Sequence, residues 1–193
     1  AKNALRRSDD HLAVVSKSEL RQTSSMTYED LNRNVAGFAA FLRQKGVVRG
    51  DRVVAYMPNI TETLVAFLAT ASIGAIWSAC SQEFGVRSVV ERFVQIEPTV
   101  LIAVDGYRYR GRDFNRINEV AEIQNQLSSL ETTVLVPYLK ESTSPSVLRN
   151  TVAWSEPWKA SDEITFESVP FDHPLWVLYS SGTTGLPKPI VQG

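Results

Sequence analysis

A run of small hydroxyl residues and glycines near the carboxyl end of the chain carries the strongest chemical signal. It reads SSGTTG and comprises Ser180, Ser181, Gly182, Thr183, Thr184 and Gly185. Glycines let backbone N–H groups converge, and small hydroxyls add donors without bulk, as the oxygens of a polyphosphate require. Lys188 follows between two prolines and supplies a positive charge. The segment favours a phosphate-binding loop over the alternative, a surface turn with an incidental lysine.

The spacing of this loop excludes a Walker-type phosphate loop. That motif places lysine directly after its last glycine and a serine or threonine next. Here Lys188 stands three places beyond Gly185, and Pro189 follows it. A hydroxyl beside the lysine that could hold Mg²⁺ is therefore missing from this segment.

A second candidate is the basic and aromatic segment DGYRYRGRDFN, residues 105–115. Arg108, Arg110 and Arg112 alternate with Tyr107 and Tyr109, so an extended conformation would place the three arginines on one face. Guanidinium groups bind phosphate and tyrosines stack on bases, which suits a nucleotide or the tail of CoA. The alternative is a solvated hairpin whose arginines pair with Asp105, Asp113 or Glu119.

These segments lie in a chain where short apolar runs alternate with helix-like stretches. Strands are predicted at residues 11–16, 51–59, 74–80, 99–105, 132–139 and 174–180. Helices are predicted after Thr27, which caps with Asp30, and at residues 61–73, 86–96 and 115–127. Residues 140–166 are expected to form a long connection with room for one short helix. The alternation predicts an α/β fold with βα units around a mostly parallel sheet.

Composition narrows the class of partner. The chain has 193 residues and a net charge of −1, which gives no field to attract nucleic acid or an acidic membrane. No run approaches the roughly 18 apolar residues that span a bilayer. Cys80 is the single cysteine, so a reducing, cytoplasmic location is expected. The chain lacks an initiator methionine, and we expect it to be a piece of a longer protein.

The segment YSSGTTGLPKP, residues 179–189, resembles the phosphate loop of the adenylate-forming superfamily, which includes acyl-CoA synthetases, luciferases and peptide-synthetase adenylation domains. It departs from the usual pattern at Pro189, where glycine is typical. Residues 27–77 resemble the opening of the acetyl-CoA synthetase branch. Residues 77–85, WSACSQEFG, and residues 105–115 are similar to the acetoacetyl-CoA synthetase branch instead.

This resemblance implies a reaction and a place in a larger enzyme. Residues 1–193 would be the front part of the large N-terminal, AMP-binding domain, with the rest of that domain and the C-terminal domain outside the chain. The implied reaction joins acetoacetate to CoA through an acyl-adenylate, releasing AMP and pyrophosphate from ATP. The alternatives are another short-chain acyl-CoA synthetase, for acetate or propionate, and a non-catalytic nucleotide-binding module.

The resemblance also implies roles for residues. The ATP phosphates would be held by Ser180, Ser181, Gly182, Thr183, Thr184, Gly185 and Lys188. The nucleotide end of CoA would contact Tyr109, Arg110, Gly111 and Arg112, of which Gly111 and Arg112 match the family run by identity. Mg²⁺ is expected with ATP, without an identified ligand. The catalytic lysine is expected beyond Gly193, so the isolated chain is expected to be inactive.

Other polar or reactive residues are interpreted as structural. Neither histidine has metal-ligand spacing, Cys80 is expected to be a small core residue, and Trp77 is interpreted as core rather than as a wall of an acyl pocket. Surface or helix-start charge is the interpretation for Asp9, Asp10, Glu29 and Asp30.

Overall fold

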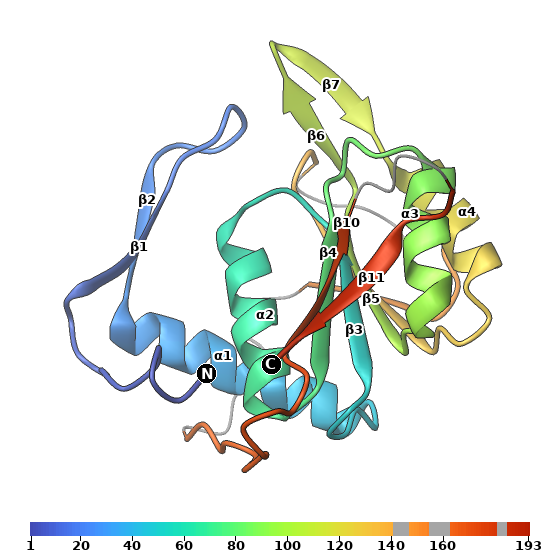
Figure 1. Ribbon diagram of the computed structural model, residues 1–193. Coiled ribbons are helices and arrows are strands. Elements are labelled where there is room, and N and C mark those ends of the chain that lie inside the picture. The colour runs from blue at the N-terminus through green and yellow to red at the C-terminus, as the bar shows by residue number, and fades with distance from the viewer. Residues whose placement is uncertain (141–146, 155–162, 181–184) are drawn as a thin grey trace.

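Seven strands among the described residues form one central sheet (Figure 1). The computed structural model describes residues 1–140, 147–154, 163–180 and 185–193. The strand order is β11-β10-β4-β3-β5-β8-β9, and every neighbouring pair is parallel except β10 with β11. The strands are β3 (Arg52–Tyr56), β4 (Ile76–Cys80), β5 (Val100–Val104), β8 (Thr132–Val136), β9 (Thr151–Ala153), β10 (Trp176–Ser180) and β11 (Lys188–Gln192). The predicted mostly parallel sheet is confirmed.

Helices cover both faces of this sheet (Figure 1). The chain places β4 on one side of β3 and then returns to place β5 on the other side. Because parallel crossovers are right-handed, this reversal places the helix before β4 and the helix after β4 on opposite faces. One face carries α1 (Tyr28–Gln44) and α2 (Thr61–Ser72), and the other carries α3 (Val86–Phe93) and α4 (Ile117–Gln126). The short 3-10 helix η1 (Val94–Ile96) continues α3.

The predicted core positions are buried. All five residues of β5 and of β8 are buried, as expected for strands covered on both faces. The start of α1 is also as predicted, because the Thr27 side chain accepts a hydrogen bond from the Asp30 N–H at 3.1 Å. None of the described helices combines the length and apolar character that a membrane crossing needs.

Three strands lie where neither a strand nor a hairpin was predicted from the sequence. β2 (Ser24–Thr27) pairs with β1 (Leu12–Ser16), β9 lies inside the expected long connection, and β11 follows the strand that was expected to be the last. Each of these strands is short or exposed, so its own residues carry little periodic signal. Pairing with a neighbouring strand, which is set by the tertiary structure, decides their conformation.

A buried carboxylate, that of Asp105, joins the ends of β5 and β8. Its Oδ1 accepts the N–H groups of Tyr138 at 2.7 Å and Leu139 at 2.8 Å, and its Oδ2 accepts that of Lys140 at 2.8 Å. Asp105 itself is 1% exposed. The chain then enters the hairpin of β6 (Gly106–Tyr109) and β7 (Arg112–Asn115), so Asp105 fixes the base of that hairpin to residues 138–140.

Gly106 allows β6 and β7 to lie close together at the base of the hairpin. A Cβ at this position would lie 2.5 Å from the Phe114 carbonyl oxygen and 2.6 Å from Leu139 Cδ2. A side chain would therefore push β6 away from β7 at the base of the hairpin, and the Leu139 side chain would have to move.

Replacing Asp105 by alanine is expected to lower the free energy of unfolding by about 3 kcal/mol, because three N–H groups lose their acceptor in a buried place. Urea unfolding followed by circular dichroism measures this change. Asp113→Ala, which removes an exposed carboxylate from the same hairpin, is expected to leave the unfolding midpoint almost unchanged. Equal midpoints for the wild type and Asp105→Ala would contradict the role given to this carboxylate.

Alkaline pH is expected to destabilise the protein through groups that folding keeps protonated. Burial raises the pKa of the Cys80 thiol from 9.0 to about 12, and those of the Tyr56 and Tyr179 hydroxyls from 10.0 to about 12. Their contribution to stability is complete below about pH 9 and is lost as the pH rises towards 12. The urea midpoint should therefore fall between about pH 9 and pH 11, and should fall less in Cys80→Ala. A midpoint that stays constant over this interval would contradict the prediction.

Candidate functional site

The two ends of the predicted phosphate loop lie opposite each other. Ser180 is the last residue of β10 and Lys188 the first of β11, and the two are directly paired in the antiparallel ladder. Gly185 has φ +109°, a backbone conformation that side chains rarely adopt. Ser181, Gly182, Thr183 and Thr184 lie outside the described residues. A hydroxyl and an exposed lysine thus flank the mouth of the loop.

Helix α3 and η1 hold both stems of this loop. The Tyr179 hydroxyl donates a hydrogen bond to the Arg92 carbonyl at 2.6 Å, and the Arg92 guanidinium lies 5.9 Å from the centre of the Tyr179 ring. On the other stem, Gln95 Nε2 donates to the Pro187 carbonyl at 2.9 Å. These supporting residues were not found from the sequence, because neither lies near the motif in the chain.

Pro189, the departure from the family pattern, lies in β11 opposite Tyr179. β11 is the outermost strand in the described sheet. Proline has no N–H to donate, and edge strands tolerate it for that reason. Proline in place of glycine therefore affects β11, the strand after the loop. Lys188 remains paired with Ser180.

The basic and aromatic segment forms a tight hairpin. Its turn residues, Arg110 and Gly111, have φ values of 51° and 74°, the combination that a two-residue type I′ turn needs. Across the strands, Arg108 is opposite Asp113, and Tyr109 is opposite Arg112. Directly opposed residues share one face of a ribbon, and successive residues alternate between faces.

The prediction that the three arginines share one face is wrong, because the turn at Arg110 reverses the chain. Arg108 lies on one face and Arg112 on the other. Arg108 donates to both carboxylate oxygens of Asp113, at 2.6 and 3.0 Å, and this pairing raises the pKa of the guanidinium. The solvated-hairpin alternative is therefore confirmed for Arg108.

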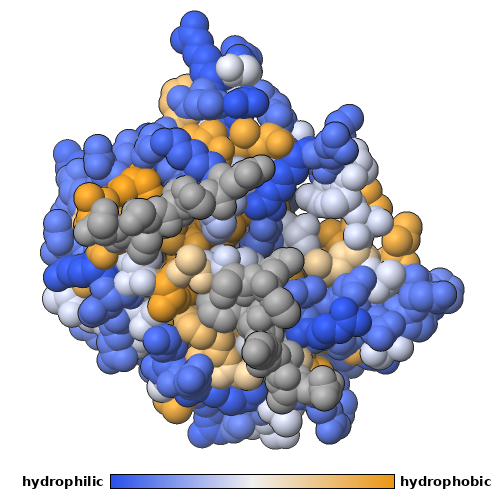
Figure 2. Space-filling view, turned by 180° about the vertical axis from the view of Figure 1, so that it is seen from behind, coloured by the Kyte–Doolittle hydropathy of each residue, from blue (hydrophilic) through white to orange (hydrophobic). Residues whose placement is uncertain are grey.

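The other arginines gather at the tip of the hairpin. Arg110 lies 5.3 Å from the centre of the Tyr109 ring, which is 48% exposed, and Arg112 is the cross-strand neighbour of that tyrosine. Gly111 supplies the turn that brings them together. Seen from behind, the projecting hairpin is mostly hydrophilic (Figure 2). Two exposed cations beside an exposed ring suit a phosphorylated, aromatic ligand.

The hairpin and the carboxyl end of β10, from which the loop starts, lie at the same edge of the sheet. β10 leads into the loop and β5 into the hairpin, and both strands run parallel to β3 and β4 between them. In open α/β sheets, ligands bind outside the carboxyl ends of the strands, beside the point where the strand order reverses. The structure thus brings both predicted segments to the edge where a ligand site is expected.

Residues 81–85, part of the segment used to narrow the family branch, cross this edge after β4. The Tyr56 hydroxyl donates to the Phe84 carbonyl at 2.7 Å. Arg116 donates from Nε to the Gln82 carbonyl at 3.0 Å and from Nη2 to the Tyr107 hydroxyl at 3.1 Å. Tyr56 and Arg116 were not singled out from the sequence, and their role as supports needs the three-dimensional contacts.

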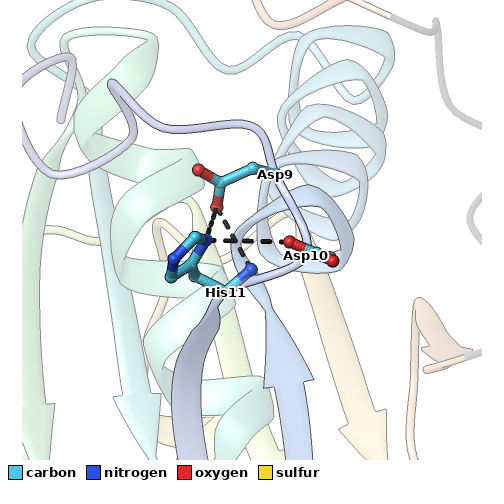
Figure 3. A group of neighbouring side chains, drawn as sticks. All are labelled: Asp9, Asp10 and His11. Carbon is cyan, nitrogen blue, oxygen red and sulfur yellow. Dashed lines mark hydrogen bonds and ion pairs between the residues drawn. The ribbon is translucent and has the colours of Figure 1, made fainter.

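Among the described residues, one group of side chains lies close enough together to hold a metal ion: Asp9, Asp10 and His11 (Figure 3). His11 Nδ1 lies 3.3 Å from Asp9 Oδ1 and 3.7 Å from Asp10 Oδ1. Asp9 also pairs with Arg7 at 2.9 Å, and the hydrogen bond from that arginine lowers the pKa of the carboxyl. Asp10 and His11 are exposed, Asp9 is half-buried, and all three are far in sequence from the loop, so we interpret the group as surface ion pairing.

The remaining residues that were set aside have structural contacts. His173 Nε2 lies 2.8 Å from the Gly74 carbonyl oxygen. Trp77 is 6% exposed and packs edge-on against Phe67, with ring centres 5.9 Å apart. Cys80 is buried. Trp77 and Cys80 are therefore buried, as predicted.

Comparisons with known proteins match the chain along almost its whole length. An acetoacetyl-CoA synthetase of Xenopus tropicalis is 39% identical over 99% of the chain, and an acetoacetyl-coenzyme A synthetase of Rhizobium meliloti is 40% identical over 99%. The solved structure of an acetoacetyl-CoA synthetase from Streptomyces lividans superposes with a TM-score of 0.91, at 47% identity over 98% of the chain. The chain spans about 30% of the length of these relatives.

The family model for the AMP-binding enzyme covers residues 1–192. That match extends from the first strand pair, through the hairpin, to the strand that follows the loop. The chain belongs to the AMP-binding enzyme family.

Proposed function

We propose that residues 1–193 are the front part of the N-terminal domain of an AMP-forming acid–thiol ligase that makes acetoacetyl-CoA. The reaction converts acetoacetate, ATP and CoA into acetoacetyl-CoA, AMP and pyrophosphate through an acyl-adenylate. The observation that carries the proposal is the pairing of Ser180 with Lys188 at the carboxyl edge of a parallel sheet. Similarity to acetoacetyl-CoA synthetases along the chain supports the choice of acid.

The loop would bind the phosphates of ATP. Backbone N–H groups at Gly182 and Gly185 and the hydroxyls of Ser180, Ser181, Thr183 and Thr184 would donate to β- and γ-phosphate oxygens. Lys188 would neutralise their charge as pyrophosphate leaves. Adenylation depends mainly on positioning and on charge neutralisation, both of which such a loop supplies. Mg²⁺, expected with ATP, would add positive charge there, and we assign it no ligand in this chain.

The tip of the hairpin would bind the nucleotide end of CoA. Arg110 and Arg112 would pair with its phosphates, Tyr109 would pack on the base or ribose, and Gly111 would keep the turn tight. The donor set fits, because both guanidinium groups are exposed and Arg108, the third arginine, is already paired with Asp113. The catalytic lysine would lie in another part of the enzyme, so the isolated chain would not complete the reaction.

The partners in this proposal are small molecules. Neither a nucleic acid nor a membrane is part of it, and the cytoplasm is the proposed location. The alternatives are a ligase for acetate or propionate and a non-catalytic nucleotide-binding module. Substrate assays separate the first alternative, and the absence of ATP–pyrophosphate exchange would favour the second.

Replacing Lys188 by alanine in the full-length ligase is expected to slow adenylation about 100-fold, because a charge that acts on the departing pyrophosphate is lost. Acetoacetate-dependent ATP–pyrophosphate exchange measures this step without CoA. Lys2→Ala, which removes an exposed lysine far from the loop in the sequence, serves as the control and should exchange normally. Unchanged exchange in Lys188→Ala would refute the proposed role of the loop.

The full-length ligase is also expected to prefer acetoacetate to acetate and propionate by at least about tenfold in kcat/KM. A difference of this size corresponds to about 1.4 kcal/mol of transition-state binding, which a fitted acyl pocket can supply. Release of AMP with each acid at a fixed CoA concentration measures it. A preference for acetate would replace the proposed acid and leave the adenylation chemistry in place.

A further inference from the structure

A carboxylate from a distant part of the chain holds the tip of the hairpin. Glu19 Oε1 accepts the N–H of Arg110 at 3.1 Å, and Glu19 Oε2 accepts the N–H of Gly111 at 3.0 Å. Glu19 lies in the connection between β1 and β2, 91 residues before Arg110. Both oxygens of one side chain are therefore engaged by the two residues of the turn.

The hairpin needs an anchor at its tip. It forms a two-stranded sheet of its own, and such hairpins are marginally stable in water without further contacts. Its base is packed, with the rings of Tyr107 and Phe114 stacked 5.0 Å apart. Among the described residues, Glu19 provides the only hydrogen bonds that reach the turn from another element.

The segment that carries Glu19 is itself anchored. Ser18 Oγ accepts the N–H groups of Leu20 at 3.3 Å and Arg21 at 3.0 Å, which fixes the bend of the chain. Arg21 then pairs with Glu62, a residue that is 9% exposed at the start of α2, at 2.6 Å. Glu19 is thus tied to the body of the molecule within two residues.

The same arginine contacts the segment that holds the base of the hairpin. Arg21 Nη2 donates to the Pro137 carbonyl at 3.4 Å, and its guanidinium lies 4.8 Å from the centre of the Tyr138 ring. The N–H of Tyr138 is in turn bound by Asp105, the residue before the hairpin. Contacts therefore form a closed path from Asp105 through residues 137–138, Arg21 and Glu19 to the tip.

We propose that Glu19 is a positioning residue for the binding of CoA. Glu19 holds the turn so that the exposed side chains at the tip of the hairpin meet the nucleotide end of CoA. This inference rests on the proposed function, because it assumes that Arg110 and Arg112 bind CoA. Within the described ranges, the hydrogen bonds of the Glu19 carboxylate come from backbone N–H groups alone. Among the described residues, neither of these two guanidinium groups has a carboxylate partner, so Glu19 orders the tip and leaves its cations available.

The charge of Glu19 is maintained at neutral pH. Hydrogen bonds from Gly111 and Arg110, with the nearby Arg108 charge, lower the pKa of its carboxyl. Hydrogen bonds to an ionised acceptor are stronger than those between neutral groups, although exposure to water reduces their net effect. A modest change in the binding of CoA is therefore expected when the carboxylate is removed.

The test measures steady-state kinetics of the full-length ligase with CoA and ATP varied in turn. Glu19→Ala is expected to raise the KM for CoA about fivefold and to leave kcat, the KM for ATP and ATP–pyrophosphate exchange within twofold of the wild type. Glu19→Gln keeps one accepting oxygen and should recover part of the loss. Glu122→Gln, which removes an exposed carboxylate from α4, is the charge-matched control and should behave as the wild type.

A double-mutant cycle tests whether Glu19 acts through the tip. In an Arg110→Ala, Arg112→Ala background, Glu19→Ala should no longer change the KM for CoA, because the side chains that it positions are absent. Persistence of the full effect in that background would overturn the inference. So would a lowered KM for CoA in Glu19→Ala, which would mean that Glu19 competes with a phosphate for the turn.

The outcomes separate this inference from the proposed function. If Arg112→Ala raises the KM for CoA and Glu19→Ala does not, the CoA site stands and the role of Glu19 is refuted. If neither variant changes that KM, the proposed CoA site is refuted together with the inference. If the wild-type ligase shows no acetoacetate-dependent exchange, the proposed reaction itself fails.

Discussion

Three backbone N–H groups converge on the buried carboxylate of Asp105. The position of the hairpin at the carboxyl edge of the sheet depends on that interaction. Parallel strands bring their carboxyl ends to one edge, but the segments that leave them would otherwise diverge. Asp105 binds the exit of β8 to the exit of β5, and Gly106 lets the first strand of the hairpin lie close to the second. One buried carboxylate accepts from three partly buried N–H donors, which makes the junction both strong and specific. The hairpin therefore leaves the sheet from a fixed base.

The loop at the other side of the edge is supported by a different device. Its stems are adjacent strands of one hairpin, so Ser180 and Lys188 are held together by the ladder itself. Tyr179 and Pro187 then attach these stems to α3 and η1. The loop and the hairpin thus gain their positions from opposite sides of β3. The strand order reverses between them, which is where open α/β sheets bind their ligands.

Much of this arrangement follows from local sequence, and the rest does not. Helix α1 and strands β5 and β8 were predicted because periodicity and capping are carried by neighbouring residues. The hydroxyl-rich loop was found for the same reason. The face of Arg108 was predicted wrongly because an arginine, rather than asparagine or glycine, occupies the first positive-φ position of the turn, where side chains are uncommon. Glu19 carried no signal at all, since its partners lie 91 and 92 residues away. Contacts of that kind are decided by the tertiary fold.

The closed path of contacts through Arg21 has a thermodynamic corollary. Coupling free energies between two sites are reciprocal, so a molecule that prefers the anchored tip must strengthen the anchor by the same factor. Under the proposed function, occupancy at Arg110 and Arg112 would then be sensed at Ser18 and Arg21, in the connection between β1 and β2. The rate at which a protease cleaves residues 17–23 would then fall as CoA fills the proposed site at the hairpin.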